Sequence, residues 1–253
     1  MSVFDAHFHI IDSRFPLVSN HGFLPDDFDV EQYLERVSLL NIKSGVVVSG
    51  SFQAFDQSYL LSALALLNSR SNNFVGVTQV PHDISDGELL KLDAAGVRGV
   101  RFNLFRGGSE RVGYLCYFAQ RVYDLCGWHI ELYISSEGLY HLQDLIKNLP
   151  KVCIDHMGME KSSFPVVDDL LRHGVYVKVC GFGRVDFDPI KRLQEMVLIN
   201  PNALMFGTDL PSTRALRPFR NEDLSLIKGI FSSDSYQNIT WHNGRRFYRL
   251  DTD

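Results

Sequence analysis

The alternation of short apolar runs with longer segments of helical periodicity constrains the fold more than any other feature of this chain. A helical pattern lies between most consecutive runs, and strand–helix alternation favours parallel strands joined by crossover helices. Eight such units within 253 residues predict an α/β fold of the TIM (β/α)8 barrel class. The strand-like runs are 3–9, 45–49, 74–79, 97–104, 129–135, 152–156, 175–180 and 203–209.

The intervening segments read as helices with recognisable ends. In the first of them, Val30, Tyr33 and Val37 recur on one apolar stripe, and Gly127 is a typical C-terminal stop for the third. An open doubly wound sheet is the alternative. It lacks its usual support, because no G-x-G-x-x-G follows the first run and no phosphate-binding P-loop motif occurs. The clearest helical segments are 29–42, 56–70, 110–127, 137–150 and 188–201.

Composition narrows the class of protein. The net charge of −5 and the pI of 6.0 give no support to nucleic-acid or anionic-membrane binding. No apolar run reaches the ~18 residues of a membrane span, and no basic segment followed by a long apolar run marks a secretory signal. We therefore expect one domain over residues 1–253, with no linker. The sequence does not indicate an oligomeric state.

The cysteines bear on the cellular compartment. None of the four forms a C-x-x-C pair, and each lies in an apolar helix-like or strand-like context. This pattern predicts buried free thiols rather than disulfides or a zinc finger, and hence a cytoplasmic protein. The residues are Cys116, Cys126, Cys153 and Cys180.

Polar side chains follow the predicted strands at the points where they end. In a parallel barrel, ligands bind at the carboxyl ends of the strands, so these side chains are expected to lie close together. We expect Glu131 and Lys178 to pair inside the barrel. Six of the residues are chemically competent and come from five different strands: His7, His9, Arg101, Tyr133, His156 and Asp209.

The direction of the first-strand histidines follows from strand alternation. Successive strand side chains point to opposite faces, which would place Asp5, His7 and His9 on one face and Phe4, Ala6 and Phe8 on the other. If the phenylalanines pack under helices, both histidines point into the barrel. Structural alternatives exist for single residues. Asp209 could cap the turn that follows it, and Arg101 could form a structural ion pair.

Five stretches of the chain contain the residues at the predicted strand ends: "DAHFHI" (5–10), "GVRGVRFNLF" (96–105), "CIDHMG" (153–158), "VYVKVCGFGR" (175–184) and "MFGTDLP" (205–211). These stretches resemble the amidohydrolase superfamily, and most of all its branch containing 2-pyrone-4,6-dicarboxylate lactonase and sugar lactonases. The C-terminal segment 238–250 resembles the closing helix of these proteins, with Gly244 where a proline is usual. The resemblance implies a distorted TIM barrel and hydrolysis at a carbonyl.

The resemblance also bears on a metal. Metal-dependent members hold one or two divalent ions with the first-strand His-x-His, a lysine or glutamate on strand four, histidines on strands five and six, and the strand-eight aspartate. Here strand four offers Arg101 and Asn103, and strand five ends in Tyr133. These departures match the lactonase branch, which is taken to work without metal, so we expect no cofactor. If zinc is bound, its expected ligands are His7, His9 and Asp209.

The chemistry of lactone hydrolysis suits these residues. It needs a base for water and a hydrogen-bonding cradle for the carbonyl oxygen. Asp209 is the expected base, while His7, His9 and His156 are expected to donate hydrogen bonds to the developing oxyanion. Arginine forks match carboxylates in geometry. The expected substrate-binding residues are Arg101, Arg184, Tyr133, Ser49 and Arg106.

The leading hypothesis is therefore a cytoplasmic hydrolase that opens a small carboxylate-bearing lactone, 2-pyrone-4,6-dicarboxylate-like or a sugar lactone, with aspartate-activated water and without metal. Its partner would be a small anionic substrate. One alternative is a zinc-dependent amidohydrolase or non-oxidative decarboxylase of the same superfamily. The other is a non-catalytic barrel that binds an anionic metabolite, in which case Asp209 would need no role as a base.

Overall fold

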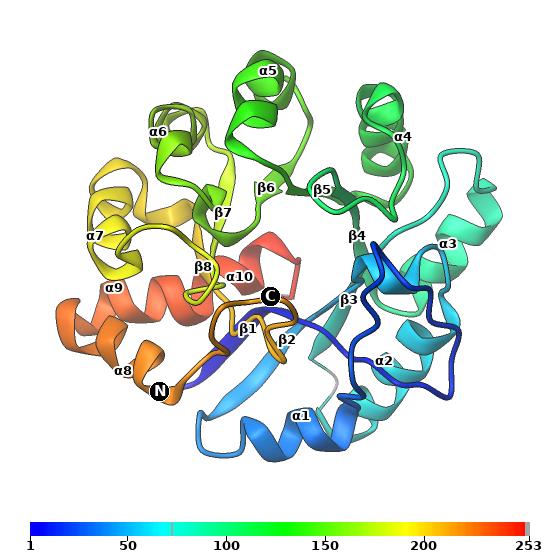
Figure 1. The fold of residues 1–253 in the computed structure, drawn as a ribbon, viewed down its shortest axis with the longest axis horizontal. Coiled ribbons are helices and arrows are strands. Elements are labelled where there is room, and N and C mark those ends of the chain that lie inside the picture. The colour runs from blue at the N-terminus through cyan, green and yellow to red at the C-terminus, as the bar shows by residue number, and fades with distance from the viewer. Residues whose placement is uncertain (72, 251–253) are drawn as a thin grey trace.

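Eight parallel strands lie in sequence order around the barrel of the computed structural model, which describes residues 1–71 and 73–250 (Figure 1). Each strand pairs with the next in parallel, so the TIM-barrel prediction is confirmed and the doubly wound alternative is wrong. The strands are β1 (Val3–Phe8), β2 (Ile42–Val48), β3 (Phe74–Thr78), β4 (Val97–Asn103), β5 (His129–Tyr133), β6 (Val152–Ile154), β7 (Tyr176–Val179) and β8 (Leu204–Phe206).

Helices surround the strands and cover the outside of the barrel (Figure 1). Each of the five clearest helical patterns coincides with one α-helix to within a few residues at its ends. Asp29 caps the first of them by accepting a hydrogen bond from the Gln32 amide, and Gly127 ends the fourth helix at φ +64°. The α-helices are α1 (Val30–Arg36), α2 (Ser58–Ser71), α3 (Asp86–Ala94), α4 (Leu115–Cys126), α5 (Ser136–Lys147), α6 (Phe164–Arg172), α7 (Pro189–Ile199), α8 (Asn221–Ile230), α9 (Ser233–Gln237) and α10 (Asn243–Phe247).

The first and last strands meet at their carboxyl ends. The Asp209 amide donates to the His7 carbonyl (2.7 Å), and the His9 amide donates to the Leu210 carbonyl (2.8 Å). Gly207 permits this approach, because a Cβ there would lie 2.8 Å from the His7 backbone nitrogen. The closure therefore places the first-strand histidines beside the strand-eight aspartate.

A bulge in β1 changes the face on which its residues lie. Asp5 pairs with Gly45 and Phe8 pairs with Val47, so β1 carries one more residue than β2 over this interval. Such an extra residue interrupts the strict alternation of side chains.

The contacts of β1 show the result. Asp5 accepts a hydrogen bond from the Tyr33 hydroxyl of α1, and Phe8 stacks on the same ring at 3.8 Å. Both residues therefore point outward. The predicted shared face is wrong for Asp5, Phe4 and Ala6, since the last two pack within the barrel. His7 and His9 still point inward, because the extra residue shifts the alternation of side chains by one position before His7.

An apolar cluster fills part of the barrel interior. The α10 end closes the amino-terminal side of the barrel, where the Phe247 ring contacts His129 and Tyr176, the first residues of β5 and β7. Gly244 is required here, because a Cβ would lie 2.3 Å from the Phe4 ring. The cluster consists of Phe4, Ala6, Val46, Val48, Val75, Val77, Cys153, Met205, Phe247 and Tyr248.

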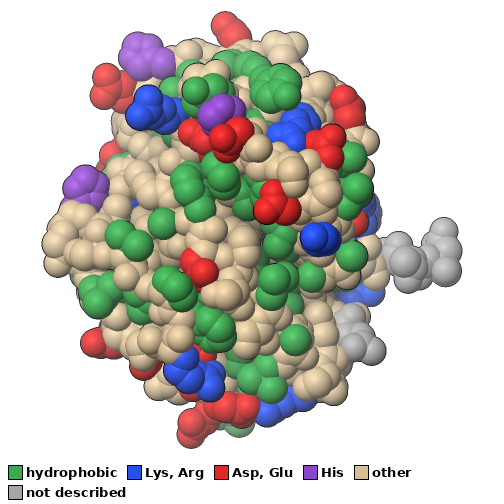
Figure 2. Space-filling view, turned by 90° about the vertical axis from the view of Figure 1, so that its right-hand side faces the viewer, with side chains coloured by type: hydrophobic (Ala, Val, Ile, Leu, Met, Phe, Trp, Pro, Cys, Tyr) green, Lys and Arg blue, Asp and Glu red, His purple; other side chains and the backbone are tan. Residues whose placement is uncertain are grey.

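The surface carries charges of both signs. On the face seen in Figure 2, basic and acidic side chains are scattered among hydrophobic ones. All four cysteines are free thiols. Cys126, Cys153 and Cys180 are buried as predicted, whereas the prediction is wrong for Cys116, which is exposed on α4. Among the described residues, no helix combines the length and apolar character needed to cross a bilayer.

Candidate active site

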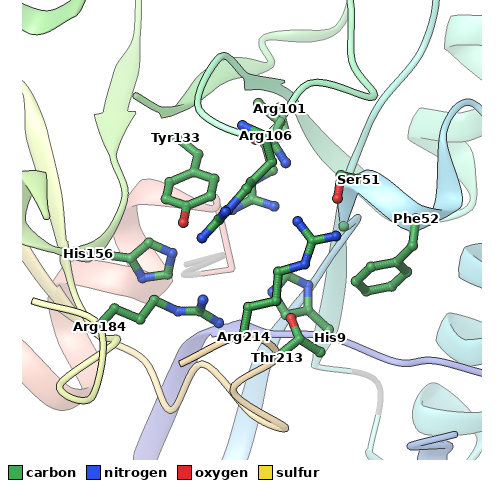
Figure 3. Close-up of a pocket in the computed structure, with 12 residues that line it drawn as sticks. His9, Ser51, Phe52, Arg101, Arg106, Tyr133, His156, Arg184, Thr213 and Arg214 are labelled. Atoms are coloured by element: carbon green, nitrogen blue, oxygen red, sulfur yellow. Dashed lines mark hydrogen bonds between the residues drawn. The ribbon is translucent and has the colours of Figure 1, made fainter. Parts of the chain in front are cut away.

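A cavity opens at the carboxyl ends of the strands (Figure 3). It contains about 360 Å³ of atom-free space, including the part open to solvent. Six of the predicted site residues line it, while His7 and Asp209 lie fully buried beside it. The lining residues are His9, Gly50, Ser51, Phe52, Arg101, Asn103, Arg106, Tyr133, His156, Arg184, Thr213 and Arg214.

Asp209 is held by a two-pronged ion pair. Arg184 Nε donates to Asp209 Oδ2 at 2.5 Å, and Nη2 donates to Oδ1 at 3.1 Å. Burial raises the pKa of Asp209, while the Arg184 charge opposes that rise. Arg184 was expected to hold a substrate carboxylate, yet here its guanidinium fork holds the carboxylate of the protein.

Both first-strand histidines present Nε2 to this carboxylate. His7 Nε2 and His9 Nε2 each lie 3.9 Å from Asp209 Oδ1. Burial lowers the pKa of both imidazoles well below the usual value, so both are neutral at pH 7. His9 Nδ1 lies 2.7 Å from the Val48 carbonyl, which can only accept. Neutral His9 therefore carries its proton on Nδ1 and offers a bare Nε2, so it acts as an acceptor and not as the expected donor.

A second buried ion pair, between Arg101 and Asp155, lies next to His7. Arg101 Nε and Nη2 donate to Asp155 Oδ2 at 3.1 and 2.7 Å, and Nη1 donates to the Ser49 carbonyl at 2.9 Å. Burial would raise the pKa of Asp155, but the Arg101 charge holds it well below its ordinary value. Arg101 thus forms the structural ion pair predicted as its alternative role, and it also lines the cavity.

His156 and Tyr133 form the opposite wall of the cavity (Figure 3). The His156 backbone is left-handed at φ +51°, and its Nδ1 lies 3.2 Å from Cys180 Sγ. Its ring centroid lies 5.0 Å from that of His7 and 5.1 Å from that of Tyr133. Within the described part of the chain, the buried Tyr133 hydroxyl has no hydrogen-bond partner, which leaves it available to a ligand.

Two further predictions concern the Lys178–Glu131 pair and Ser49. The Lys178 ammonium donates to Glu131 Oε2 inside the barrel, so the predicted interior pair is confirmed. Ser49 is fully buried and its hydroxyl lies 2.6 Å from the Tyr59 hydroxyl, so it does not line the cavity. Ser51, two residues later, takes that place.

The mouth of the cavity carries two more arginines. Arg214 follows Asp209 by five residues, and sequence reasoning missed it because loop paths have no periodicity. Arg214 Nη1 donates to Asn20 Oδ1 at 3.1 Å, and its guanidinium carbon lies 4.3 Å from the Phe23 ring centroid. Asn20 Nδ2 donates to the Arg106 carbonyl at 3.0 Å. Within residues 1–71 and 73–250, neither Arg106 nor Arg214 has a carboxylate partner.

Three groups of described side chains converge closely enough to be considered for a metal. One is the predicted set of His7, His9 and Asp209, and the others combine His7, Asp155 and His156, or His129, Glu131 and Cys153. The predicted set does not fit a divalent ion well. Both Asp209 oxygens already accept from the Arg184 guanidinium, so a bound ion would face a fixed positive charge across one carboxylate.

The profile of a protein family described as amidohydrolase matches residues 4–250. This chain belongs to the amidohydrolase family. The resemblance seen in its motifs is therefore confirmed, and it extends over nearly the whole amidohydrolase barrel described above.

Two relatives of this amidohydrolase are named for lactone hydrolysis. It is 26% identical over 229 residues to a 4-sulfomuconolactone hydrolase of Hydrogenophaga intermedia, covering 82% of this chain and 74% of that protein. It is 32% identical over 159 residues to a 2-pyrone-4,6-dicarboxylate hydrolase of Comamonas testosteroni, covering 61% of this chain and 51% of that protein.

Solved structures share the fold. The crystal structure of a probable 2-pyrone-4,6-dicarboxylic acid hydrolase from Acinetobacter baumannii superposes with a TM-score of 0.83 at 23% identity, covering 98% of this chain and 100% of the other. A putative 2-pyrone-4,6-dicarboxylic acid hydrolase from Pseudomonas putida gives 0.80 at 21% identity, covering 100% and 99%.

Proposed function

We propose that this amidohydrolase opens a small lactone that carries anionic groups. The observation that carries the proposal is the placement of a buried carboxylate, Asp209, against two imidazole Nε2 atoms at 3.9 Å, beside a cavity lined by four arginines. The relatives named for lactone hydrolysis support the same reaction class.

Binding would use the uncompensated charge at the mouth. Arg101 and Arg184 are each neutralised by a buried carboxylate, whereas Arg106 and Arg214 have no such partner in the described part of the chain. The guanidinium fork suits a carboxylate or a sulfonate oxygen pair. Arg106 and Arg214 would therefore hold an acidic group of the substrate, with the Tyr133 hydroxyl and Ser51 close by.

The nucleophile would be a water held between two acceptors. Asp209 Oδ1 and His9 Nε2, 3.9 Å apart, can receive the two protons of one water. Asp209 takes a proton as the water oxygen bonds to the lactone carbonyl carbon, and the carbonyl oxygen becomes an oxyanion. When the ring C–O bond breaks, the protonated Asp209 returns its proton to the departing oxygen.

The oxyanion would accept hydrogen bonds from His7 and His156, with the Tyr133 hydroxyl as a further donor. We propose that no metal takes part, because an ion on Asp209 would face the positive charge of the Arg184 guanidinium across the same carboxylate. Cytoplasmic location also belongs to the proposal, supported by four free thiols, three of them buried.

The test is a lactone panel combined with metal analysis. Protein purified without added metal or chelator is assayed on mono- and dicarboxylated lactones, a sulfonated lactone and sugar lactones, before and after chelation. The expected result is chelator-resistant turnover of a dianionic lactone at substoichiometric metal content. Activity that is lost on chelation and restored by zinc would favour the zinc-dependent alternative. Binding of anions without turnover of any lactone would favour the non-catalytic one.

A further inference from the structure

A buried lysine, Lys178, lies next to the His7 imidazole on the side away from Asp209. Lys178 on β7 is fully buried, and its Nζ lies 3.3 Å from His7 Nδ1. The same ammonium donates to Glu131 Oε2 and lies 4.0 Å from Asp155 Oδ1. Lys178 thus contacts the His7 ring nitrogen opposite the one that faces Asp209.

Three groups compete for His7 Nδ1, and they differ in alignment. Asp155 Oδ1 lies 3.3 Å and Glu131 Oε1 lies 3.5 Å from this nitrogen. Within the described residues, neither oxygen takes part in a hydrogen bond, so neither is an established acceptor for a proton on Nδ1. The Lys178 ammonium is the group that meets Nδ1 in hydrogen-bond geometry.

The ammonium can only donate. A hydrogen bond from Lys178 therefore requires Nδ1 to be the acceptor, and a neutral imidazole must then carry its proton on Nε2. Burial lowers the pKa of Lys178, but the Glu131 and Asp155 carboxylates outweigh it and raise that pKa above its ordinary value. Lys178 thus stays charged, and His7 stays neutral because burial lowers its own pKa.

We propose that Lys178 is a positioning residue that fixes His7 as the Nε2–H tautomer, so that His7 donates a hydrogen bond to the lactone carbonyl. His9 has the opposite tautomer, set by the Val48 carbonyl, and accepts from the attacking water. One imidazole thus polarises the carbonyl while the other orients the nucleophile. This inference rests on the proposed lactone hydrolysis for its consequence, but the tautomer itself is measurable without a substrate.

The experiment compares two variants that both lack the Glu131 charge. Glu131→Gln keeps the Lys178 donor, whereas Lys178→Met/Glu131→Gln removes it without leaving an unpaired buried carboxylate at position 131. Nitrogen-15 NMR of histidine-labelled protein, assigned with His7→Gln, reports which ring nitrogen carries the proton. We expect Nε2–H in the wild type and in Glu131→Gln, and a shift of the proton to Nδ1 in the double variant.

Steady-state kinetics give the second readout. Loss of one preorganised donor to an oxyanion typically lowers kcat by roughly 10²–10³-fold. The kcat of the double variant should therefore be lower than that of Glu131→Gln by about this factor, and the KM values of the two variants should agree within a few-fold. A purely structural role would lower stability and kcat in both variants alike.

The outcomes separate the two proposals. Nδ1–H on His7 in the wild type would overturn the role of Lys178 even if no variant folds, and so would the same tautomer in both variants. An Nε2–H His7 in a protein that turns over no lactone would leave the tautomer assignment standing and overturn the proposed function instead.

Discussion

The floor of the cavity and its mouth both carry arginines, but in different electrostatic states. At the floor, Arg101 and Arg184 are each locked to a buried carboxylate, Asp155 and Asp209. At the mouth, Arg106 and Arg214 are half-buried. Each guanidinium lies over an aromatic ring, and that of Arg214 also donates to the Asn20 carbonyl. The same side chain therefore sets geometry in one region and supplies net charge in the other.

This difference assigns separate tasks to the two regions. A buried arginine–carboxylate pair fixes the orientation of its carboxylate, and because its net charge is zero it adds little attraction for an anion. An arginine without a carboxylate at a solvent-facing rim attracts anions, and that attraction is screened by salt. Changes at the floor should therefore affect turnover and folding, and changes at the mouth should affect substrate affinity.

Asp209→Asn should give the largest effect. The amide cannot take a proton from water, so kcat should fall by roughly 10²–10⁴-fold with KM changed only a few-fold. Steady-state assays of ring opening measure both constants. Circular dichroism of the variant controls for folding. Turnover within tenfold of the wild type would remove Asp209 from the role of base.

Asp155→Asn should mainly destabilise the fold. It removes the carboxylate that accepts two hydrogen bonds from the buried Arg101 guanidinium and leaves Glu131 Oε1 at 3.4 Å from Nε. Breaking a buried ion pair typically costs about 3–5 kcal/mol. Urea denaturation followed by fluorescence measures the free energy of unfolding. The matched control is Arg101→Met/Asp155→Leu, which removes both charges and should recover most of that loss. If the single variant unfolds at the same urea concentration as the wild type, this floor pair is not a structural one.

Arg184→Gln should shift the pH dependence of kcat/KM. Burial raises the pKa of Asp209 and the Arg184 charge opposes the rise, so removal of that charge raises the pKa further. The base acts only as a carboxylate, hence activity is present above this pKa and is lost as the pH falls through it. The acid limb of the profile should move to higher pH in the variant. An unchanged or lower acid limb would contradict the pairing seen here.

Arg106→Ala and Arg214→Ala should each raise KM by roughly 10–100-fold, because a hydrogen bond between charged groups contributes about 1.5–3 kcal/mol. Effects on kcat should be smaller than those at the floor. Arg111→Ala, an exposed arginine of the same loop as Arg106, is the control for net charge. The KM of the wild type should rise with salt, and less steeply in the two mouth variants. Equal KM values for Arg106→Ala and Arg111→Ala would remove the distinction between floor and mouth.

The sequence predicted the architecture and the floor of the site better than its mouth. Strand ends of a parallel barrel meet by geometry, so the strand pattern alone was enough to group His9, Arg101 and His156. The bulge in β1 left no trace in the periodicity, and it made the predicted orientation of Asp5 wrong. Arg214 and its partner Asn20 lie in loops, where chain path depends on contacts that no local pattern encodes.

The turn at Asn20 connects three loops at the mouth of the cavity. It belongs to the loop after β1, yet it contacts the Arg106 carbonyl and both amino groups of Arg214, which come from the loops after β4 and β8. The Arg214 side chain is thus immobilised during folding, and its rotamer entropy need not be lost again on binding. Exchange of residues 12–28 between homologues would therefore alter the ligand range while the aspartate and its imidazoles keep their positions.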